Sequence, residues 1–140
     1  MTLAFIARNP YTRQIGACIA SGSDDCTGGS LFFKETIGVV SVQASGSPDV
    51  GAAALKMLEE GVEPAHILDR LRATDNKYEL RQVLIVPFEG KIAVHTGREC
   101  ISWAGHVVKE HCTAAGNMLT GGDCLEAMEK AYMAEMQALM

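Results

Sequence analysis

The residues whose types and spacing could do chemistry are concentrated in one short stretch, 96–106. It contains the single tryptophan, Trp103, together with Cys100, His106 and two glycines. The stretch lies between two segments of strand-like composition, so a glycine-permitted bend there would present polar side chains at the edge of a sheet. A β-hairpin that places Trp103 in the core is the alternative interpretation of the same spacing.

Thr2 is a second candidate, as an N-terminal nucleophile. It follows Met1, and we expect Met1 to be removed because the next residue is small. The free α-amine of Thr2 would have a pKa of about 8, so it could take the hydroxyl proton during attack on an amide carbonyl. An amine still in peptide linkage to Met1 could not serve as this base. The strand expected directly behind it, 3–8, would hold Thr2 rigidly.

The histidines and cysteines allow a metal site or a Cys–His nucleophilic pair as alternatives. His95, His106 and His111 lie near Cys100 and Cys112, but no pair has i, i+4 spacing on an expected helix. The five cysteines contain no Cys-x-x-Cys, which favours buried reduced thiols. A nucleophilic Cys100 would also need surroundings that stabilise its thiolate. We therefore expect no metal and no cofactor.

Composition limits the classes of partner. The 140 residues carry a net charge of −5, and their basic residues are scattered, which argues against nucleic acid. A small uncharged or cationic ligand, or another protein, fits better. Because no apolar run approaches the ~20 residues of a membrane span and no signal-peptide pattern opens the chain, we expect a cytoplasmic protein with no membrane contact.

Periodicity and turn residues predict the elements that position these candidates. Expected strands are 3–8, 14–21, 37–44, 81–87, 91–96 and 106–112, and expected helices are 49–60, 64–72 and a C-terminal helix from Asp123. Turn residues at 9–13 and 88–90 predict two hairpins, 3–8 with 14–21 and 81–87 with 91–96, and Ile67, Leu68 and Leu71 are expected on the inward face of helix 64–72. Segments 22–29 and 114–122 are expected to be a surface loop and a turn-rich stretch. Ser47 and Pro48 form a helix-entry signal, because serine caps free N–H groups and proline fits the first turn.

This order of elements predicts an α+β fold. The expected strands come in runs rather than alternating with helices, which favours antiparallel sheets with segregated helices. Two sheets packed face to face, with helices outside, would explain strands that are apolar on both sides. The methionine-rich terminal helix should cover a sheet or meet another subunit, so we expect a homo-oligomer, a dimer or larger.

Several of these residues occur in an order that resembles the DUF1028 family, from Thr2 to the start of the last helix. The motifs that carry the resemblance are Thr2–Pro10, Arg81-Gln82, Thr96-Gly97, Cys100, Trp103-Ala-Gly-His106 and Gly116-Asn117-x-Leu119-x-Gly121. The resemblance implies an N-terminal nucleophile (Ntn) hydrolase-like fold, a four-layer αββα sandwich, over one domain of residues 1–140. It also implies that a C-terminal segment usual in the family is missing, which would leave a sheet edge for a partner.

The resemblance also implies roles for individual residues. Thr2 would be nucleophile and base, the Gly116 or Asn117 N–H or the Asn117 side chain would stabilise an oxyanion, and His106 or Arg81 would orient substrate. Other residues at or near matching motif positions, expected to bind substrate, are Gln43, Gln82, Thr96 and Trp103. Two functions follow: an amidohydrolase acting on a small or cyclic amide, or a non-catalytic ligand-binding or assembly subunit of the same fold.

Overall fold

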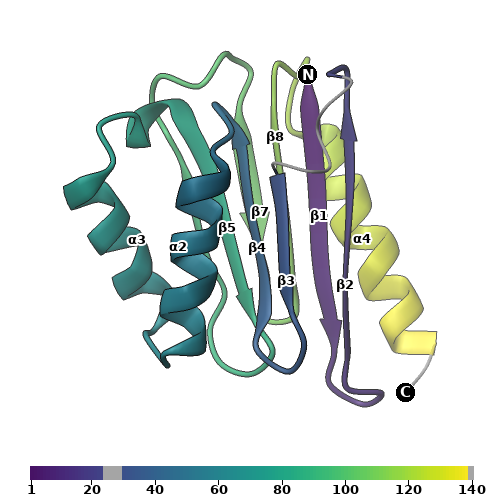
Figure 1. The fold of residues 1–140 in the computed structure, drawn as a ribbon. Coiled ribbons are helices and arrows are strands. Elements are labelled where there is room, and N and C mark those ends of the chain that lie inside the picture. Colours follow the sequence, from purple (N-terminus) through teal and green to yellow (C-terminus); the bar gives the residue numbers. More distant parts are fainter. Residues whose placement is uncertain (24–29, 139–140) are drawn as a thin grey trace.

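The chain folds into four layers, in which two antiparallel sheets pack face to face and helices cover their outer faces (Figure 1). The structure, a computed structural model, describes residues 1–23 and 30–138. Sheet A has the strand order β2-β1-β8-β7, and sheet B has the order β3-β4-β5-β6. The strands are β1 (Thr2–Asn9), β2 (Gln14–Ser21), β3 (Leu31–Lys34), β4 (Gly38–Ala44), β5 (Arg81–Pro87), β6 (Ala93–Thr96), β7 (Gly105–Val108) and β8 (Cys112–Asn117). The predicted α+β class and αββα sandwich are confirmed.

Strand β1 lies inside sheet A, between β2 and β8. Its register places Thr2 opposite Ser21 on β2 and opposite Asn117 on β8. The β1–β2 hairpin forms as predicted, and the Asn9 side chain holds its turn by accepting hydrogen bonds from the backbone N–H of Tyr11 and Thr12. The N-terminus therefore lies at one end of the sandwich and this turn at the other (Figure 1).

The helices form the outer layers. Helices α2 (Pro48–Glu59) and α3 (Pro64–Thr74) lie on sheet B, and α4 (Asp123–Ala138) lies on β7 and β8. Helix α2 begins where the sequence predicts, because Ser47 Oγ accepts a hydrogen bond from the Val50 N–H at 3.3 Å. Tyr132 fastens α4 to sheet A by donating its hydroxyl to the Arg8 carbonyl at 2.6 Å.

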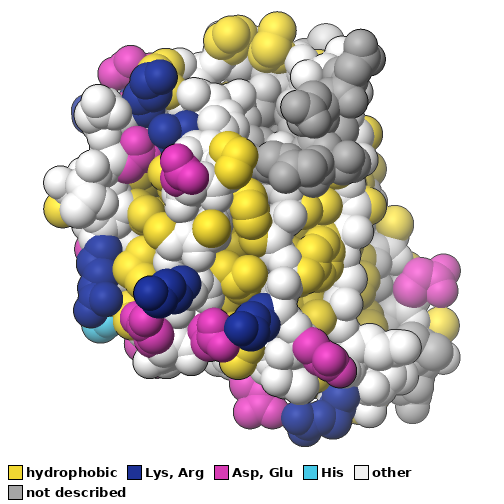
Figure 2. Space-filling view, in the orientation of Figure 1, with side chains coloured by type: hydrophobic (Ala, Val, Ile, Leu, Met, Phe, Trp, Pro, Cys, Tyr) yellow, Lys and Arg dark blue, Asp and Glu magenta, His cyan; other side chains and the backbone are white. Residues whose placement is uncertain are grey.

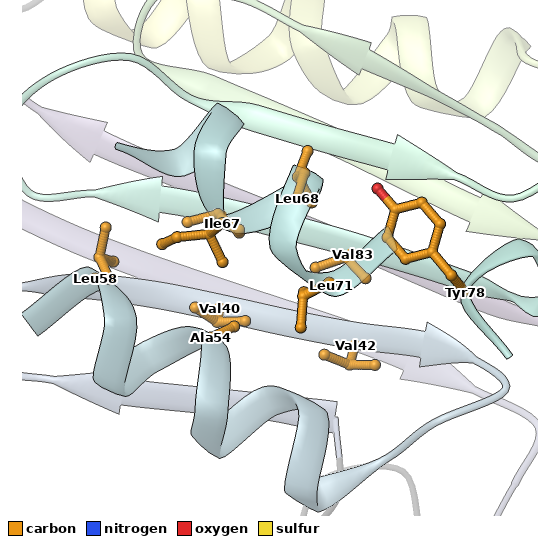
Figure 3. Packing of buried hydrophobic residues seen from close by; sticks show 10 residues of the cluster. Val40, Val42, Ala54, Leu58, Ile67, Leu68, Leu71, Tyr78 and Val83 are labelled. Atoms are coloured by element: carbon orange, nitrogen blue, oxygen red, sulfur yellow. The ribbon is translucent and has the colours of Figure 1, made fainter. Parts of the chain in front are cut away.

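Alternation along β4 and β5 separates two apolar cores. Residues 40, 42, 83 and 85 point outward to the helices, where Val40, Val42 and Val83 meet Ala54 and Leu71 (Figure 3). The alternate positions point inward and, with sheet A, form the core between the sheets: Ala4, Ile6, Val39, Leu84, Val86 and Ala115. The same period of two places Gln43 and Gln82 in the inter-sheet layer.

One stretch of the predicted order is wrong. Instead of a single strand over 106–112 followed by turns, the chain forms β7, a tight connection and then β8, which is buried throughout. The small residues 114–116 look loop-like in sequence, but they fit an interior strand whose backbone pairs on both sides. Strand β3 was also not predicted. Of the expected loop 22–29, residues 24–29 lie outside the described part.

Charges of both signs are interspersed on the face shown in Figure 2, where Lys and Arg groups sit beside Asp and Glu groups around an apolar band. The face shows no continuous basic field of the kind that binds nucleic acid. Within residues 1–23 and 30–138, no helix has the length and apolar character needed to cross a membrane.

Candidate functional site

Three buried amide side chains connect the two sheets near the N-terminus. Gln82 Oε1 accepts hydrogen bonds from Gln43 Nε2 and from Asn117 Nδ2, both at 3.0 Å. Gln43 Nε2 also donates to the Ala115 carbonyl at 3.2 Å. Gln43, Gln82 and Asn117 are 2%, 0% and 3% exposed, so these bonds form away from water, where an unmade bond is most costly. We call these three residues the amide network.

The amide network continues to the edge of the sandwich. Gln82 Nε2 donates to Thr96 Oγ1 at 3.1 Å and to the carbonyls of Gly105 and Gly116. Thr96 Oγ1 in turn lies 2.8 Å from His106 Nδ1. The His106 side chain is exposed at this edge, but the protein atoms around its ring lower its pKa by desolvation, and His95 lowers it further. The imidazole is therefore neutral at neutral pH.

Thr2 lies directly beside this network. It faces the inter-sheet layer, because it shares a side of β1 with Ala4 and Ile6. Its register partner on β8 is Asn117, at the Cα separation of about 4.5–5.5 Å that opposed residues have. On the other side, Thr2 Oγ1 lies 3.0 Å from Ser21 Oγ. Thr2 is thus flanked by a polar residue on each neighbouring strand, and its hydroxyl contacts that of Ser21.

Met1 lies directly before Thr2, and two hydrogen bonds hold it at this end of the sandwich. Its amino group donates to Met118 Sδ at 3.3 Å, and its carbonyl accepts from the Gly22 N–H at 3.0 Å. In this form of the chain, the nitrogen of Thr2 belongs to a peptide bond and has no basic lone pair. Removal of Met1 would convert it into an amine at the same place.

Trp103 covers the turn that follows β8. Its backbone exchanges hydrogen bonds with Leu119 in both directions, at 3.1 and 3.0 Å. Its ring lies over Gly105 and Gly122; a Cβ on Gly105 would come within 2.5 Å of Trp103 Cη2. Trp103 is 39% exposed, so the interpretation that places it in the core does not hold. Together with Ile101 and Met118, which are also exposed, it forms an apolar rim at this end of the sandwich.

Comparison with known proteins identifies the family. The model of the "Family of unknown function (DUF1028)" matches residues 2–140. This chain belongs to the DUF1028 family. A solved structure of the same family, protein SPO2555 from Silicibacter pomeroyi, matches with a TM-score of 0.89 and 30% sequence identity over 95% of this chain. The chain spans 62% of the length of that protein. No curated protein matches the sequence.

Arg81, also expected at the site of this DUF1028 protein, lies apart from the amide network. It points toward the end of α3 and forms a two-point ion pair with Asp75, with Nε–Oδ2 at 2.5 Å and Nη2–Oδ1 at 3.2 Å. Its Nη1 also donates to the carbonyls of Ser45 and Gly46. The hydrogen bond from Arg81, the largest effect, lowers the pKa of Asp75. Arg81 therefore joins three segments at the start of β5: β5 itself, the chain after β4 and the end of α3.

The Cys–His alternative finds no support in the geometry. His95 stacks on Tyr78 with ring centroids 3.7 Å apart, and its Nε2 lies 3.1 Å from the Tyr78 carbonyl. Burial raises the pKa of the Cys100 thiol, so the thiolate is disfavoured. In the part of the chain that the structure describes, no three His, Cys, Asp or Glu residues are grouped as a metal site.

Two residues of the site were missed by sequence reasoning. Ser21 could have been found, because continuing the predicted hairpin register outward from its turn places Ser21 opposite Thr2. Ser41 could also have been found, because it lies two positions before Gln43 in the expected strand 37–44 and therefore shares its face. Ser41 Oγ and Gln43 Oε1 lie on the same face of β4 and are buried with no hydrogen-bond partner among the described residues. This face of β4 therefore has one hydroxyl and one amide oxygen that can still form hydrogen bonds next to the amide network.

Proposed function

We propose that the protein is an N-terminal nucleophile amidohydrolase that acts on a small or cyclic amide, with Thr2 as nucleophile. One observation carries the proposal: Thr2 lies inside sheet A, faces the inter-sheet layer, and is bracketed by Ser21 and Asn117. The αββα sandwich, which we infer to be of the Ntn hydrolase type, supports it. The register holds the hydroxyl and the α-nitrogen of Thr2 together on a rigid strand, as catalysis requires.

The reaction follows from the chemistry of the free N-terminus. After removal of Met1, the α-amine of Thr2 takes the hydroxyl proton while Oγ1 attacks the amide carbonyl. One N–H of the Asn117 amide already bonds Gln82, so the other can stabilise the oxyanion. The C–N bond then breaks, the leaving nitrogen takes the proton from the α-amine, and water hydrolyses the resulting ester to free Thr2.

The surroundings of Thr2 favour a neutral amide as substrate. The described side chains of the site are uncharged: Ser21, Gln43, Gln82, Asn117 and a neutral His106. A charged substrate would lose its hydration there without an opposite charge in return. The apolar rim of Ile101, Trp103 and Met118 would contact a substrate group that extends outward. Gln82 and Thr96 would act by positioning Asn117 and His106 rather than by touching substrate.

N-terminal mass analysis and two substitutions test the proposal. We expect protein from its native host to lack Met1, and to hydrolyse neutral anilides. Thr2→Ala should lose this activity by at least 100-fold, because no nucleophile remains, while Thr2→Ser should retain a measurable part. Thr12→Ala, in the exposed β1–β2 turn, is the matched control and should leave the rate unchanged. Retention of Met1 in every molecule, or full hydrolysis by Thr2→Ala, would refute the proposal.

A non-catalytic assembly subunit is the second candidate. The observation that favours it is the set of large apolar side chains that stay exposed on the described residues. Such a subunit would use exposed apolar side chains, among them Met133 on α4, to form a homo-oligomer. Light scattering at micromolar concentration distinguishes this role, because a strictly monomeric protein contradicts it.

A further inference from the structure

We propose that a cleft at the end of the sandwich opposite Thr2 binds small organic anions that carry an apolar group. The cleft has a volume of about 620 Å³, within the usual range for small-molecule pockets. It lies where three hairpin turns meet, β1–β2, β5–β6 and β7–β8. Strand β1 runs from Thr2 to this end, so the two sites are about 20 Å apart. We call it the turn cleft.

Arg8 makes the turn cleft rigid. Its Nη1 donates to the Pro87 carbonyl at 2.8 Å, and its Nη2 donates to the carbonyls of Gly90 and Glu110 at 2.6 and 2.8 Å. One guanidinium thus ties the β5–β6 turn to the β7–β8 turn from the end of β1. Burial, the largest effect, lowers the pKa of Arg8, but arginine stays cationic at any physiological pH. A wall fixed in this way is preformed for a ligand.

The charge of the turn cleft is opposite to that of the chain. Four cationic side chains line it, Arg8, Arg13, Lys91 and Lys109, against the carboxylates of Glu89 and Glu110. Arg13 pairs with Glu89 at 3.3 Å and Lys109 pairs with Glu129 at 3.8 Å, so Arg8 and Lys91 are the lining cations without an ion pair among the described residues. The chain as a whole carries a net charge of −5. A local excess of positive charge in a concave site attracts anions and raises their local concentration.

The lining also supplies an apolar surface and an unused polar atom. Pro10, Phe88 and Ile92 line the cleft, and the Arg13 guanidinium lies 5.5 Å from the centre of the Phe88 ring. His111 Nδ1 is buried with no hydrogen-bond partner among the described residues. A planar carboxylate with an aromatic body fits the apolar lining and the positive charge of the cleft: its ring packs on Phe88 and its charge faces the lysines.

Benzoate is a suitable probe, and benzyl alcohol is its neutral counterpart. Neither compound carries an amide that Thr2 could attack. We expect amide resonances of the ¹⁵N-labelled full chain to shift with millimolar benzoate, with the shifts centred on residues 88–92 and 109–111. Lys91→Gln and Lys109→Gln should each weaken binding about threefold, in keeping with exposed charges worth less than about 1 kcal/mol. Benzyl alcohol should bind at least fivefold more weakly than benzoate.

Lys56→Gln, on the outer helix α2, removes the same charge away from the turn cleft and should leave benzoate affinity unchanged. The proposal is overturned by shifts centred elsewhere, by equal affinity for the alcohol, by lysine variants that behave like Lys56→Gln, or by no binding at 50 mM benzoate. Folding of each variant is checked by its unchanged spectrum without ligand. The hydrolysis assay reports on Thr2 independently, so the failure of either proposal leaves the other standing.

Discussion

The Thr96 hydroxyl lies 2.8 Å from His106 Nδ1 and joins the edge strands of the two sheets. The same hydroxyl accepts from Gln82 Nε2, so its proton is free to point at the imidazole. When Nδ1 is unprotonated it accepts this proton, and a neutral ring agrees with the lowered pKa of His106. The pair closes the side of the sandwich next to the amide network.

This pair predicts a pH dependence of stability. The folded pKa of His106 lies below its usual value of about 6.5, so the unfolded chain binds more protons in the interval between the two. The stabilisation that neutral His106 gives to the folded state is therefore complete above about pH 6.5 and is lost as pH falls through the folded pKa. Urea unfolding from pH 7.5 to 5 should show this loss, and His106→Gln should reduce it. His95, whose pKa is also lowered mainly by burial, should contribute to the loss in the same direction.

Loss of Gln82 should be more severe than loss of any other member of the amide network. Gln82→Leu keeps the volume but removes the acceptor of both Gln43 and Asn117, so buried donors are left unsatisfied. We expect the free energy of unfolding to fall by about 3 kcal/mol. Gln14→Leu, at an exposed position of β2, is the control and should change it by less than about 0.5 kcal/mol. Equal effects of the two substitutions would contradict the assigned role.

The contact between Trp103 and Gly105 predicts a rescue. Gly105→Ala places a methyl group against the indole ring, so we expect a loss of about 1–3 kcal/mol and a change in tryptophan fluorescence. In a chain that already carries Trp103→Ala, Gly105→Ala should cost much less stability than it does in the unmodified chain, and a double-mutant cycle measures this difference. Gly16→Ala, where a Cβ meets nothing within 4 Å, should be close to neutral. Additive effects of the Gly105 and Trp103 substitutions would exclude the contact.

The ion pair of Arg81 and Asp75 predicts that Arg81 matters chiefly for folding. The two side chains are 7% and 8% exposed, so Arg81→Met leaves a buried carboxylate unpaired and should cost about 3–5 kcal/mol at pH 7. The folded pKa of Asp75 is lowered, so this stabilisation exists above its unfolded value of about 3.9 and is lost as pH falls through the folded pKa. Urea titrations at pH 7 and pH 3 measure the difference.

Arg98→Met provides the matched control, because Arg98 is 88% exposed in its pair with Glu79 and should contribute less than about 1 kcal/mol. If Arg81 instead binds substrate, as the family resemblance implies, Arg81→Lys would raise KM while leaving the unfolding curve unchanged. The two-point geometry argues for the opposite, since lysine cannot reproduce the fork of arginine.

Local signals were read correctly wherever a few neighbouring residues decide the structure. The turn at Asn9, the Ser47 cap of α2 and the apolar face of α3 each follow from hydrogen bonds or contacts within a few positions. The prediction for β8 was wrong for the opposite reason. Its Ala-Ala-Gly segment has little strand propensity of its own and is a strand only because β1 and β7 pair with it.

The sequence by itself determined the α+β class, the two predicted hairpins, the helix positions to within two residues and, through family motifs, most candidate residues around Thr2. The tertiary structure alone decided which of them meet. Gln43 and Gln82 meet as register partners of β4 and β5 within sheet B, but Gln82 and Asn117 are 35 positions apart and Gln43 and Ala115 are 72 apart, so these last two bonds depend on how the two sheets pack. Alternation along β5 places Arg81 on the opposite face from Gln82, where it meets Asp75 instead of the network. The face to which each side chain points follows from the local period of a strand. Contacts between side chains of two sheets form only once the register of both sheets is set.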